Sequence, residues 1–221
     1  MSLPDLSPKA RLLVSLQNDG LHDPRVIDAL EKVPREHFVP EELQSRAYEN
    51  VALPIGGEQT ISQPTVVAHM VQAASPKPTD HVLEIGTGSG YCAAVLAQLA
   101  HDVVSLEIRP DLAFSAERRL KELGVENVQV IVADGSLGWG ELGPYEVILT
   151  TAASPGLPPV LLEQLSPNGG RLVAPVGSLR RQELVYALRT GKDIQSRRIG
   201  SVRFVPLVGA AGFNVLDSRK N

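Results

Sequence analysis

The chain has 221 residues, of which 43% are hydrophobic and 21% charged, the balance of an ordinary globular protein. The net charge is −4, and the basic pairs Arg180-Arg181, Arg197-Arg198 and Arg219-Lys220 are short and scattered, so no nucleic-acid partner is expected. A lone cysteine, Cys92, excludes an intrachain disulfide and favours a reducing, cytoplasmic compartment. No apolar run nears the roughly 20 residues that cross a bilayer, and the histidines lack metal-ligand spacing. Neither a membrane partner nor a metal is expected.

The N-terminal part predicts two helices separated by an irregular stretch. Asp23-Pro24 is typical of a capped helix start, and the apolar period that follows ends at Pro34. Residues 37–62 hold many turn residues and no clear period, which predicts a loop-rich segment of the kind that often carries function. A second helix is expected from Pro64 to about Ala74.

From residue 81 onward, strand and helix patterns alternate. Strands are expected at residues 81–85, 103–107, 128–132, 145–150 and 170–176, and helices at 91–99, 110–123 and 158–165. Alternation of this kind predicts an α/β fold with a Rossmann-like, doubly wound, mostly parallel sheet that carries helices on both faces. Residues 183–189 and 196–205 resemble strands of an antiparallel hairpin that closes the sheet.

We expect one domain over residues 1–221. Its three parts are an N-terminal portion of helices and substrate-side loop (1–75), a cofactor-binding core (76–178), and C-terminal strands with a tail (179–221).

A glycine-rich motif follows the first strand of the alternating region. It reads Val82-Leu83-Glu84-Ile85-Gly86-Thr87-Gly88-Ser89-Gly90-Tyr91, a buried strand running through three alternating glycines into a helix. Glycine lets the backbone turn sharply and approach a ligand closely. Tyr91 stands where a dinucleotide fingerprint has glycine or alanine, and no Gly-Lys-Ser/Thr follows, which excludes a P-loop. The motif resembles motif I of Rossmann-type methyltransferases, which implies S-adenosylmethionine as cofactor.

Carboxylates end the next two strands of this region. Glu107 follows the first glycine by about twenty residues, where a carboxylate can accept hydrogen bonds from ribose hydroxyls. By resemblance, Asp134 in Ala133-Asp134-Gly135 meets the adenine amino group. Each feature alone could be a turn or a solvated strand end, but the three together favour a nucleoside site. The expected cofactor-binding residues are Glu84, Gly86, Thr87, Gly88, Ser89, Gly90, Glu107, Ile108, Asp134, Gly135 and Thr150.

Longer blocks of sequence narrow the methyltransferase class. They include Val33-Pro34-Arg35-Glu36-His37-Phe38-Val39-Pro40, Gln59-Thr60-Ile61-Ser62-Gln63-Pro64 and Phe204-Val205-Pro206-Leu207. With these blocks the chain resembles the protein-L-isoaspartate O-methyltransferases over roughly residues 20 to 212. The resemblance implies methylation of the free carboxylate of L-isoaspartyl residues in damaged proteins and peptides, with S-adenosylhomocysteine as product. It also implies a cytoplasmic repair enzyme, which we expect to be a monomer.

The acceptor is already a nucleophile, so the reaction needs orientation more than a general base. By resemblance, Ser62 orients the isoaspartyl carboxylate; a second, compatible role for Ser62 is the N-cap of the helix that begins at Pro64. The substrate-binding residues implied by the resemblance are Ile55, Gly56, Gln59, Thr60, Ile61, Val208 and Gly209.

Four positions depart from the family pattern. Glu58 replaces a glycine and Asn50 an aspartate in the acceptor region, whereas the changes at Ala133 and Glu146 are mild. A carboxylate at position 58 would repel an anionic acceptor unless it points to solvent or pairs with a cation. Three alternatives therefore stay open: the same cofactor with a different carboxylate acceptor, a non-catalytic nucleoside-binding module, and, least favoured, an NAD-dependent oxidoreductase.

Overall fold

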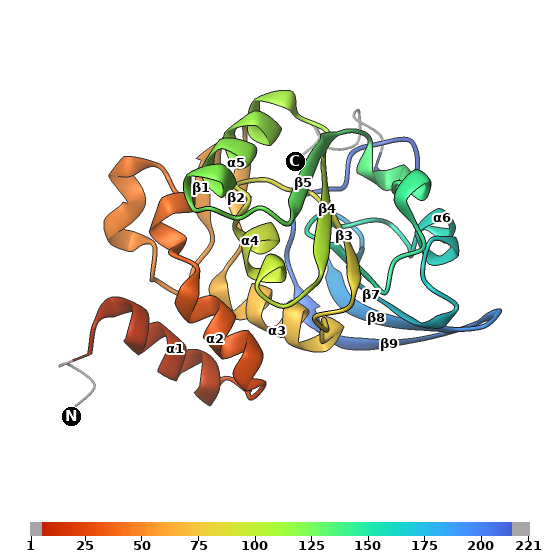
Figure 1. Ribbon diagram of the computed structural model, residues 1–221, viewed down its shortest axis with the longest axis horizontal. Helices are drawn as coiled ribbons and strands as arrows, with labels where there is room; N and C mark the ends of the chain where they lie inside the picture. The colour runs from red at the N-terminus through yellow and green to blue at the C-terminus, as the bar shows by residue number, and fades with distance from the viewer. Residues whose placement is uncertain (1–5, 214–221) are drawn as a thin grey trace.

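A computed structural model describes residues 6–213; residues 1–5 and 214–221, which include the pair Arg219-Lys220, lie outside the described residues. A seven-stranded sheet of order β5-β4-β3-β6-β7-β8-β9 forms the centre, and a two-stranded sheet, β1-β2, stands apart from it (Figure 1). The strands are β1 (Leu53–Gly56), β2 (Gln59–Ile61), β3 (His81–Ile85), β4 (Asp102–Glu107), β5 (Val128–Val132), β6 (Val147–Thr150), β7 (Asn168–Gly177), β8 (Gln182–Thr190) and β9 (Asp193–Val202). The helices are α1 (Pro8–Asn18), α2 (Pro24–Lys32), α3 (Pro64–Ala74), α4 (Tyr91–Ala97), α5 (Pro110–Glu122) and α6 (Pro159–Glu163), with short 3-10 turns η2 (Arg35–Phe38), η3 (Glu41–Arg46), η4 (Gly135–Leu137) and η5 (Gly140–Leu142).

Pairing in the large sheet confirms the predicted fold class. Strands β5, β4, β3, β6 and β7 run parallel, while β7-β8 and β8-β9 pair antiparallel. The chain leaves β3 toward β4 on one side and later returns to place β6 on the other side. Ligands of open α/β sheets bind at such a reversal, beside the carboxyl ends of the strands.

Alternating side chains of the buried strands build a hydrophobic core on each face of the sheet. In β6, Leu149 belongs to the core shared with α1–α4, and Ile148 belongs to the core shared with α6. Both faces are therefore covered, as a parallel sheet requires.

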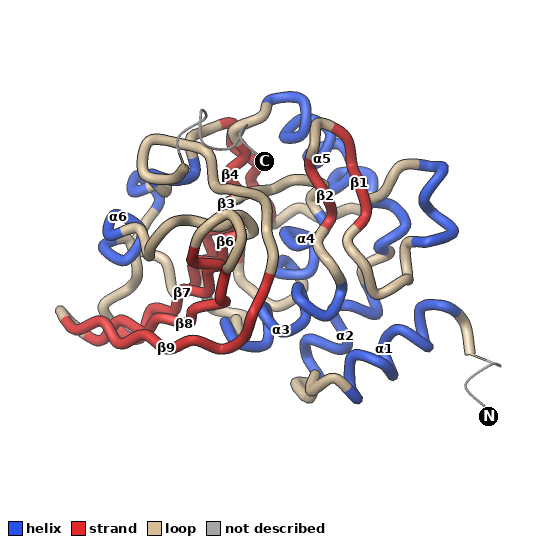
Figure 2. Tube along the Cα trace, turned by 180° about the vertical axis from the view of Figure 1, so that it is seen from behind, coloured by secondary structure: helices blue, strands red, loops and turns tan. Residues whose placement is uncertain are grey.

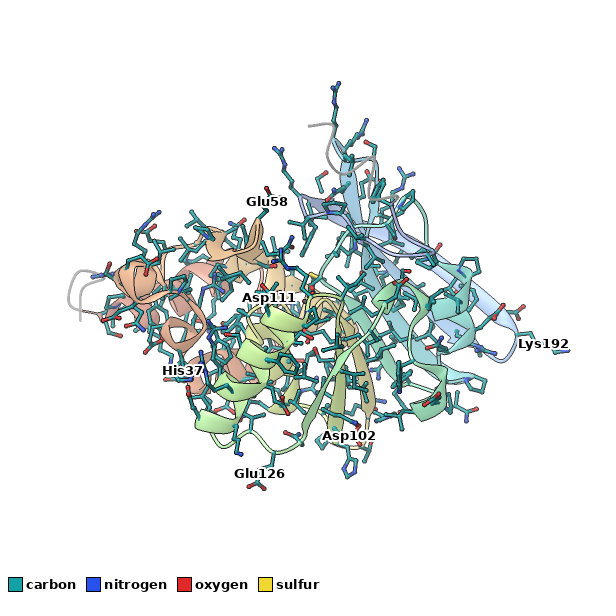
Figure 3. The ribbon with its side chains drawn as sticks, turned by 90° about the horizontal axis from the view of Figure 1, so that it is seen from above. His37, Glu58, Asp102, Asp111, Glu126 and Lys192 are labelled. Carbon is teal, nitrogen blue, oxygen red and sulfur yellow. The ribbon has the colours of Figure 1, made fainter. Side chains whose placement is uncertain are left out.

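The N-terminal helices lie to one side of the sheet, together with the β1-β2 hairpin (Figure 1). The view from behind shows this hairpin beside α5 (Figure 2). The β8-β9 hairpin projects at the opposite side, with Lys192 at its tip (Figure 3). Within residues 6–213, no helix is both long and apolar enough to cross a bilayer.

Several elements were not predicted, among them α1 and the β1-β2 hairpin. Helix α1 begins at Pro8 after Ser7, whose side chain accepts a hydrogen bond from the Ala10 N–H at 3.2 Å. The segment 37–62, expected to be loop-rich, contains η3 and the β1-β2 hairpin. Strands of three and four residues are too short to show a period. The bounds of some predicted strands also differ slightly: β6 begins two residues later than expected, and β9 spans 193–202 rather than 196–205.

The start of α3 differs from prediction in its cap. The N-cap position is Gln63, and no side chain of that position caps the helix. Instead, Asn50 Oδ1 accepts hydrogen bonds from the Thr65 backbone N–H at 3.1 Å and from its hydroxyl at 2.9 Å. The predicted capping role of Ser62 is therefore wrong, because a side chain fifteen residues from Thr65 satisfies the helix start. Asn50, one of the four positions noted in the sequence, therefore caps the start of α3.

Candidate functional site: a cavity at the strand ends

A cavity of about 560 Å³ lies at the carboxyl ends of β3 and β4, between the β1-β2 hairpin and residues 205–208. Of the residues expected to bind cofactor or substrate, those that line it are Gln59, Thr60, Ile61, Ser62, Gly86, Thr87, Gly88, Ser89, Glu107, Ile108, Gly135 and Val208. Those that do not are Ile55, Gly56, Glu84, Gly90, Asp134, Thr150 and Gly209. The structure therefore brings the glycine motif, Glu107 and Ser62 to one space.

The glycine loop needs its glycines for both conformation and space. Gly86, Gly88 and Gly90 have φ angles of +95°, +54° and +90°, in the left-handed region that favours glycine. A Cβ at Gly86 would lie 2.4 Å from Thr151 Oγ1, which donates hydrogen bonds to the carbonyls of Ile85 and Gly86. The loop backbone is thus fixed against the end of β6 and exposed to the cavity.

Glu107 forms part of the cavity wall at the end of β4. One carboxylate oxygen accepts a hydrogen bond from the Gly88 N–H at 2.8 Å, and the other accepts from the Arg109 N–H at 3.1 Å. Each oxygen of a carboxylate can accept more than one hydrogen bond. The side chain is therefore held in place with capacity left for hydroxyl donors of a ligand.

Glu84 lies behind the cavity rather than in its wall. The Ser105 hydroxyl donates to its carboxylate at 2.5 Å, and the same hydroxyl lies 2.6 Å from Thr87 Oγ1, which lines the cavity. Burial raises the pKa of Glu84 to about 7. A hydrogen-bonded chain through Ser105 thus connects a buried acid to the glycine loop; no sequence motif singles out Ser105.

Asp134 fastens the C-terminal segment. One oxygen accepts from the Ser136 N–H and hydroxyl, at 3.0 and 2.7 Å, and the other accepts from the Ala210 N–H at 2.8 Å. Its predicted contact with an adenine stays a prediction, while its neighbour Gly135 does line the cavity.

The β1-β2 turn stands over the cavity rim. Gly57 and Glu58 both have left-handed φ angles, +57° and +61°, as a tight hairpin turn requires. Arg109 Nη1 donates to the Gly57 carbonyl at 2.5 Å, and Arg109 also forms an ion pair with Asp111 at 3.0 Å. Glu58 is exposed and projects from the outer tip of the hairpin (Figure 3). Glu58 also lines the cavity, so its carboxylate lies at the rim, close to the proposed acceptor side.

Ser62, in the short segment between β2 and α3, lines the cavity. Its carbonyl accepts a hydrogen bond from Arg35 Nη2 at 2.8 Å. Sequence reasoning missed the support that this buried arginine gives, and it missed further wall residues: Arg109, Thr151, Ala152, Val205, Pro206 and Leu207. Most of these lie in or next to quoted motifs, but nothing in the motifs themselves shows that they meet at one cavity. Residues 6–213 contain no group of His, Cys, Asp and Glu suited to a metal ion.

A family model, curated relatives and solved structures all match this chain to the same family. The family model described as "Protein-L-isoaspartate(D-aspartate) O-methyltransferase" matches residues 7–212. A relative in Protochlamydia amoebophila named protein-L-isoaspartate O-methyltransferase is 54% identical over 201 residues, 90% of this chain and 95% of its own length. One of the same name in Serratia proteamaculans is 50% identical over 197 residues, 89% of this chain and 94% of its own length.

Two solved structures are similar along most of the chain. One, named protein-L-isoaspartate O-methyltransferase, has a TM-score of 0.82 and 31% identity; the match covers 92% of this chain and 66% of that one. The other, a putative enzyme of that name from Plasmodium falciparum in complex with S-adenosyl-L-homocysteine, has a TM-score of 0.78 and 25% identity, over 92% and 99% of the two chains.

Proposed function

The chain belongs to the protein-L-isoaspartate (D-aspartate) O-methyltransferase family, and we propose that its cavity holds S-adenosylmethionine beside the carboxylate of an isoaspartyl residue. The protein is an S-adenosylmethionine-dependent methyltransferase that methylates isoaspartyl residues in protein repair. The observation that carries the assignment of the site is the meeting of the glycine loop, Glu107 and Ser62 at one cavity.

The residues of the cavity suit this cofactor. A loop of glycines with left-handed φ angles lets the backbone approach a ligand closely, and the Glu107 carboxylate can accept hydrogen bonds from two ribose hydroxyls. Ile108 offers an apolar, half-exposed side chain next to Glu107, against which a flat base can pack. When bound, the cofactor supplies an already activated methyl group.

The acceptor side consists of Ser62 and the hairpin. Ser62 orients the acceptor carboxylate by hydrogen bonding, and the backbone of residues 55–61 and of Val208-Gly209 holds the peptide extended. A carboxylate attacks without a general base, so these residues contribute orientation and exclusion of water. A monomer as the working unit is part of this proposal. The free, buried thiol of Cys92 suits a reducing cytoplasm.

The test is transfer of labelled methyl groups from S-adenosylmethionine to two peptides of one sequence, isoaspartyl and aspartyl. We expect base-labile label on the isoaspartyl peptide alone, because a carboxyl methyl ester hydrolyses in base. Equal labelling of both peptides would favour a different carboxylate acceptor. Cofactor binding by calorimetry without any labelling would favour a nucleoside-binding module and would overturn the proposal.

Ser62→Ala tests the assigned role of Ser62. Loss of a hydrogen bond to a charged acceptor is expected to lower kcat/KM for the isoaspartyl peptide by roughly 10- to 100-fold, with cofactor affinity unchanged. The control is Ser196→Ala, an exposed serine of β9 that pairs with Ala187 toward the outer end of the β8-β9 hairpin and does not line the cavity. Turnover equal to the control would remove Ser62 from the mechanism.

A further inference from the structure

Arg35 is an arginine in the interior of the protein, with 1% of its surface exposed. It begins the 3-10 turn η2, yet its hydrogen bonds go to distant backbone carbonyls. Nε donates to Ala47 at 2.8 Å, and Nη2 donates to Ser62 at 2.8 Å, across 12 and 27 residues of sequence. A guanidinium fork can make such paired contacts where a lysine ammonium cannot.

The charge of Arg35 has no acidic partner. Among residues 6–213, no carboxylate lies within 4.0 Å of the guanidinium, and Nη1 is buried without a hydrogen-bond acceptor. The adjacent carboxylate of Glu36 instead accepts from the Tyr48 hydroxyl. A buried charge without a counter-ion destabilises the fold, so its presence calls for a functional reason.

Both contacts of Arg35 with the site reach residues of the cavity wall. Ser62 belongs to the acceptor side, and Tyr91 is the first residue of α4, directly after the glycine loop. The Arg35 Cζ atom lies 4.9 Å from the centroid of the Tyr91 ring, the geometry of a cation-π contact. Arg35 itself does not line the cavity; it lies behind the wall and joins its acceptor part to its cofactor part.

We propose that Arg35 is a positioning residue for the acceptor carboxylate: it holds Ser62 in register with Tyr91 and presents an uncompensated positive charge behind that part of the cavity. The inference rests on the proposed function, because it takes Ser62 to be where the carboxylate binds. The anionic acceptor supplies the missing counter-charge when it binds. The methyl ester product is neutral and cannot do so, so the same charge favours exchange of product for substrate.

The test compares a charged and a neutral ligand of one shape. Affinities of wild type and Arg35→Met are measured by calorimetry, with S-adenosylhomocysteine bound, for an isoaspartyl peptide and for its isoasparaginyl amide. We expect wild type to prefer the carboxylate and Arg35→Met to lose about tenfold or more of that preference, since the long-range charge is gone. Affinity for S-adenosylhomocysteine should change by less than about twofold. Arg46→Met, which removes an exposed arginine of neighbouring η3 paired with Glu49, is the matched control and should retain the wild-type preference.

Two further variants separate charge from packing. Arg35→Lys keeps the charge, whereas Arg35→Gln keeps a donor for the Ser62 carbonyl without charge. We expect Arg35→Lys to retain the preference for the carboxylate with a lower kcat, and Arg35→Gln to lose the preference with a raised KM. If Arg35→Met does not fold, these two variants still test whether the charge of Arg35 determines the preference for the carboxylate.

Equal loss of affinity for carboxylate and amide, or an unchanged ratio in a folded Arg35→Gln, would show that Arg35 is structural only and overturn the inference. Failure of the proposed function would be recognised separately, because the wild-type protein would then transfer no methyl group to the isoaspartyl peptide.

Discussion

Glu84 is a charged residue type at a fully buried position, directly beneath the glycine loop. The Ser105 hydroxyl donates to one of its oxygens, and the other oxygen has no hydrogen-bond partner in the described structure. Burial raises the pKa of Glu84 to about 7, and the negative charge of Glu107 adds to the effect. A protonated Glu84 is neutral and keeps its place in the chain that reaches Thr87, so the glycine loop is supported without a buried charge.

Glu84→Gln makes this protonation measurable. The ordinary pKa is 4.5, so between about pH 4.5 and 7 the folded protein keeps a proton that the unfolded chain has released. The stability that Glu84 contributes is full below pH 4.5 and is lost as the pH rises through 7, a change on the order of 3 kcal/mol. The free energy of unfolding of wild type minus that of Glu84→Gln should therefore fall across this window in urea titrations. A difference independent of pH would contradict the protonation. Glu126→Gln, at an exposed position that projects from the body in Figure 3, is the control.

At the scale of elements, the turn of the β1-β2 hairpin is tied to the loop between β4 and α5 by one arginine, while Leu53 and Ile61 of its strands are buried in the core. Arg109 donates to the Gly57 carbonyl, and Asp111 in the first turn of α5 holds the guanidinium in place. The hairpin has three and four residues per strand, and a two-stranded hairpin of that size has little stability of its own.

Arg109→Met should release the turn of the hairpin without unfolding the protein. We expect faster amide hydrogen exchange across residues 56–60 with unchanged exchange in α3 and β3, measured by mass spectrometry. The control is Arg118→Met, which removes an exposed arginine of α5 that pairs with Glu122. Equal exchange in the two variants would show that the hairpin is held by its other contacts.

At the scale of the whole molecule, Arg171 on β7 joins the helical layer to the sheet. Its guanidinium forms a buried ion pair with Asp80, next to the start of β3, and donates to the Ser75 carbonyl at the end of α3 at 2.7 Å. Side-chain exposures of 12% and 5% leave little water to screen the pair.

Arg171→Met should lower the free energy of unfolding by about 3–5 kcal/mol, because Asp80 is then a buried charge without a partner. The double variant Arg171→Met with Asp80→Asn should recover much of the loss. Chemical denaturation of both variants checks this, and a double variant no more stable than the single one would show that packing, rather than the charge, accounts for the loss.

The parts of the molecule that sequence could predict are those with a local signal. Alternating strands and helices predicted the parallel sheet, and the spacing of Gly86 and Glu107 predicted that both would meet at one edge. The structure confirms the sheet and places both residues at the cavity. Helix α1 went unpredicted although Ser7-Pro8 is a start signal: its leucines and valine are crowded into Leu12–Leu16, and only Leu12 and Leu16 of this helix are buried.

Features that depend on contacts distant in sequence could not be predicted. The Asn50 cap acts across 15 residues, and Arg35 reaches Ser62 across 27. Neither residue belongs to a periodic pattern, and an arginine followed by Glu36 and His37 gives no sign that it will be buried. Predicting such roles requires the tertiary fold, since the side chain and its partner are brought together only by packing.

The outermost strand, β9, has a further consequence for an enzyme that repairs damaged proteins. Among residues 6–213, no further strand pairs with its outer edge, and nearly all of its side chains are exposed. Unpaired edges recruit unfolded chains into intermolecular sheets, which is the first step of aggregation. Arg197 and Arg198 on this strand, the latter paired with Glu183 at 2.8 Å, act as gatekeepers against such recruitment. A repair enzyme meets partly unfolded clients throughout its working life, and we expect this charged border to oppose its joining their aggregates.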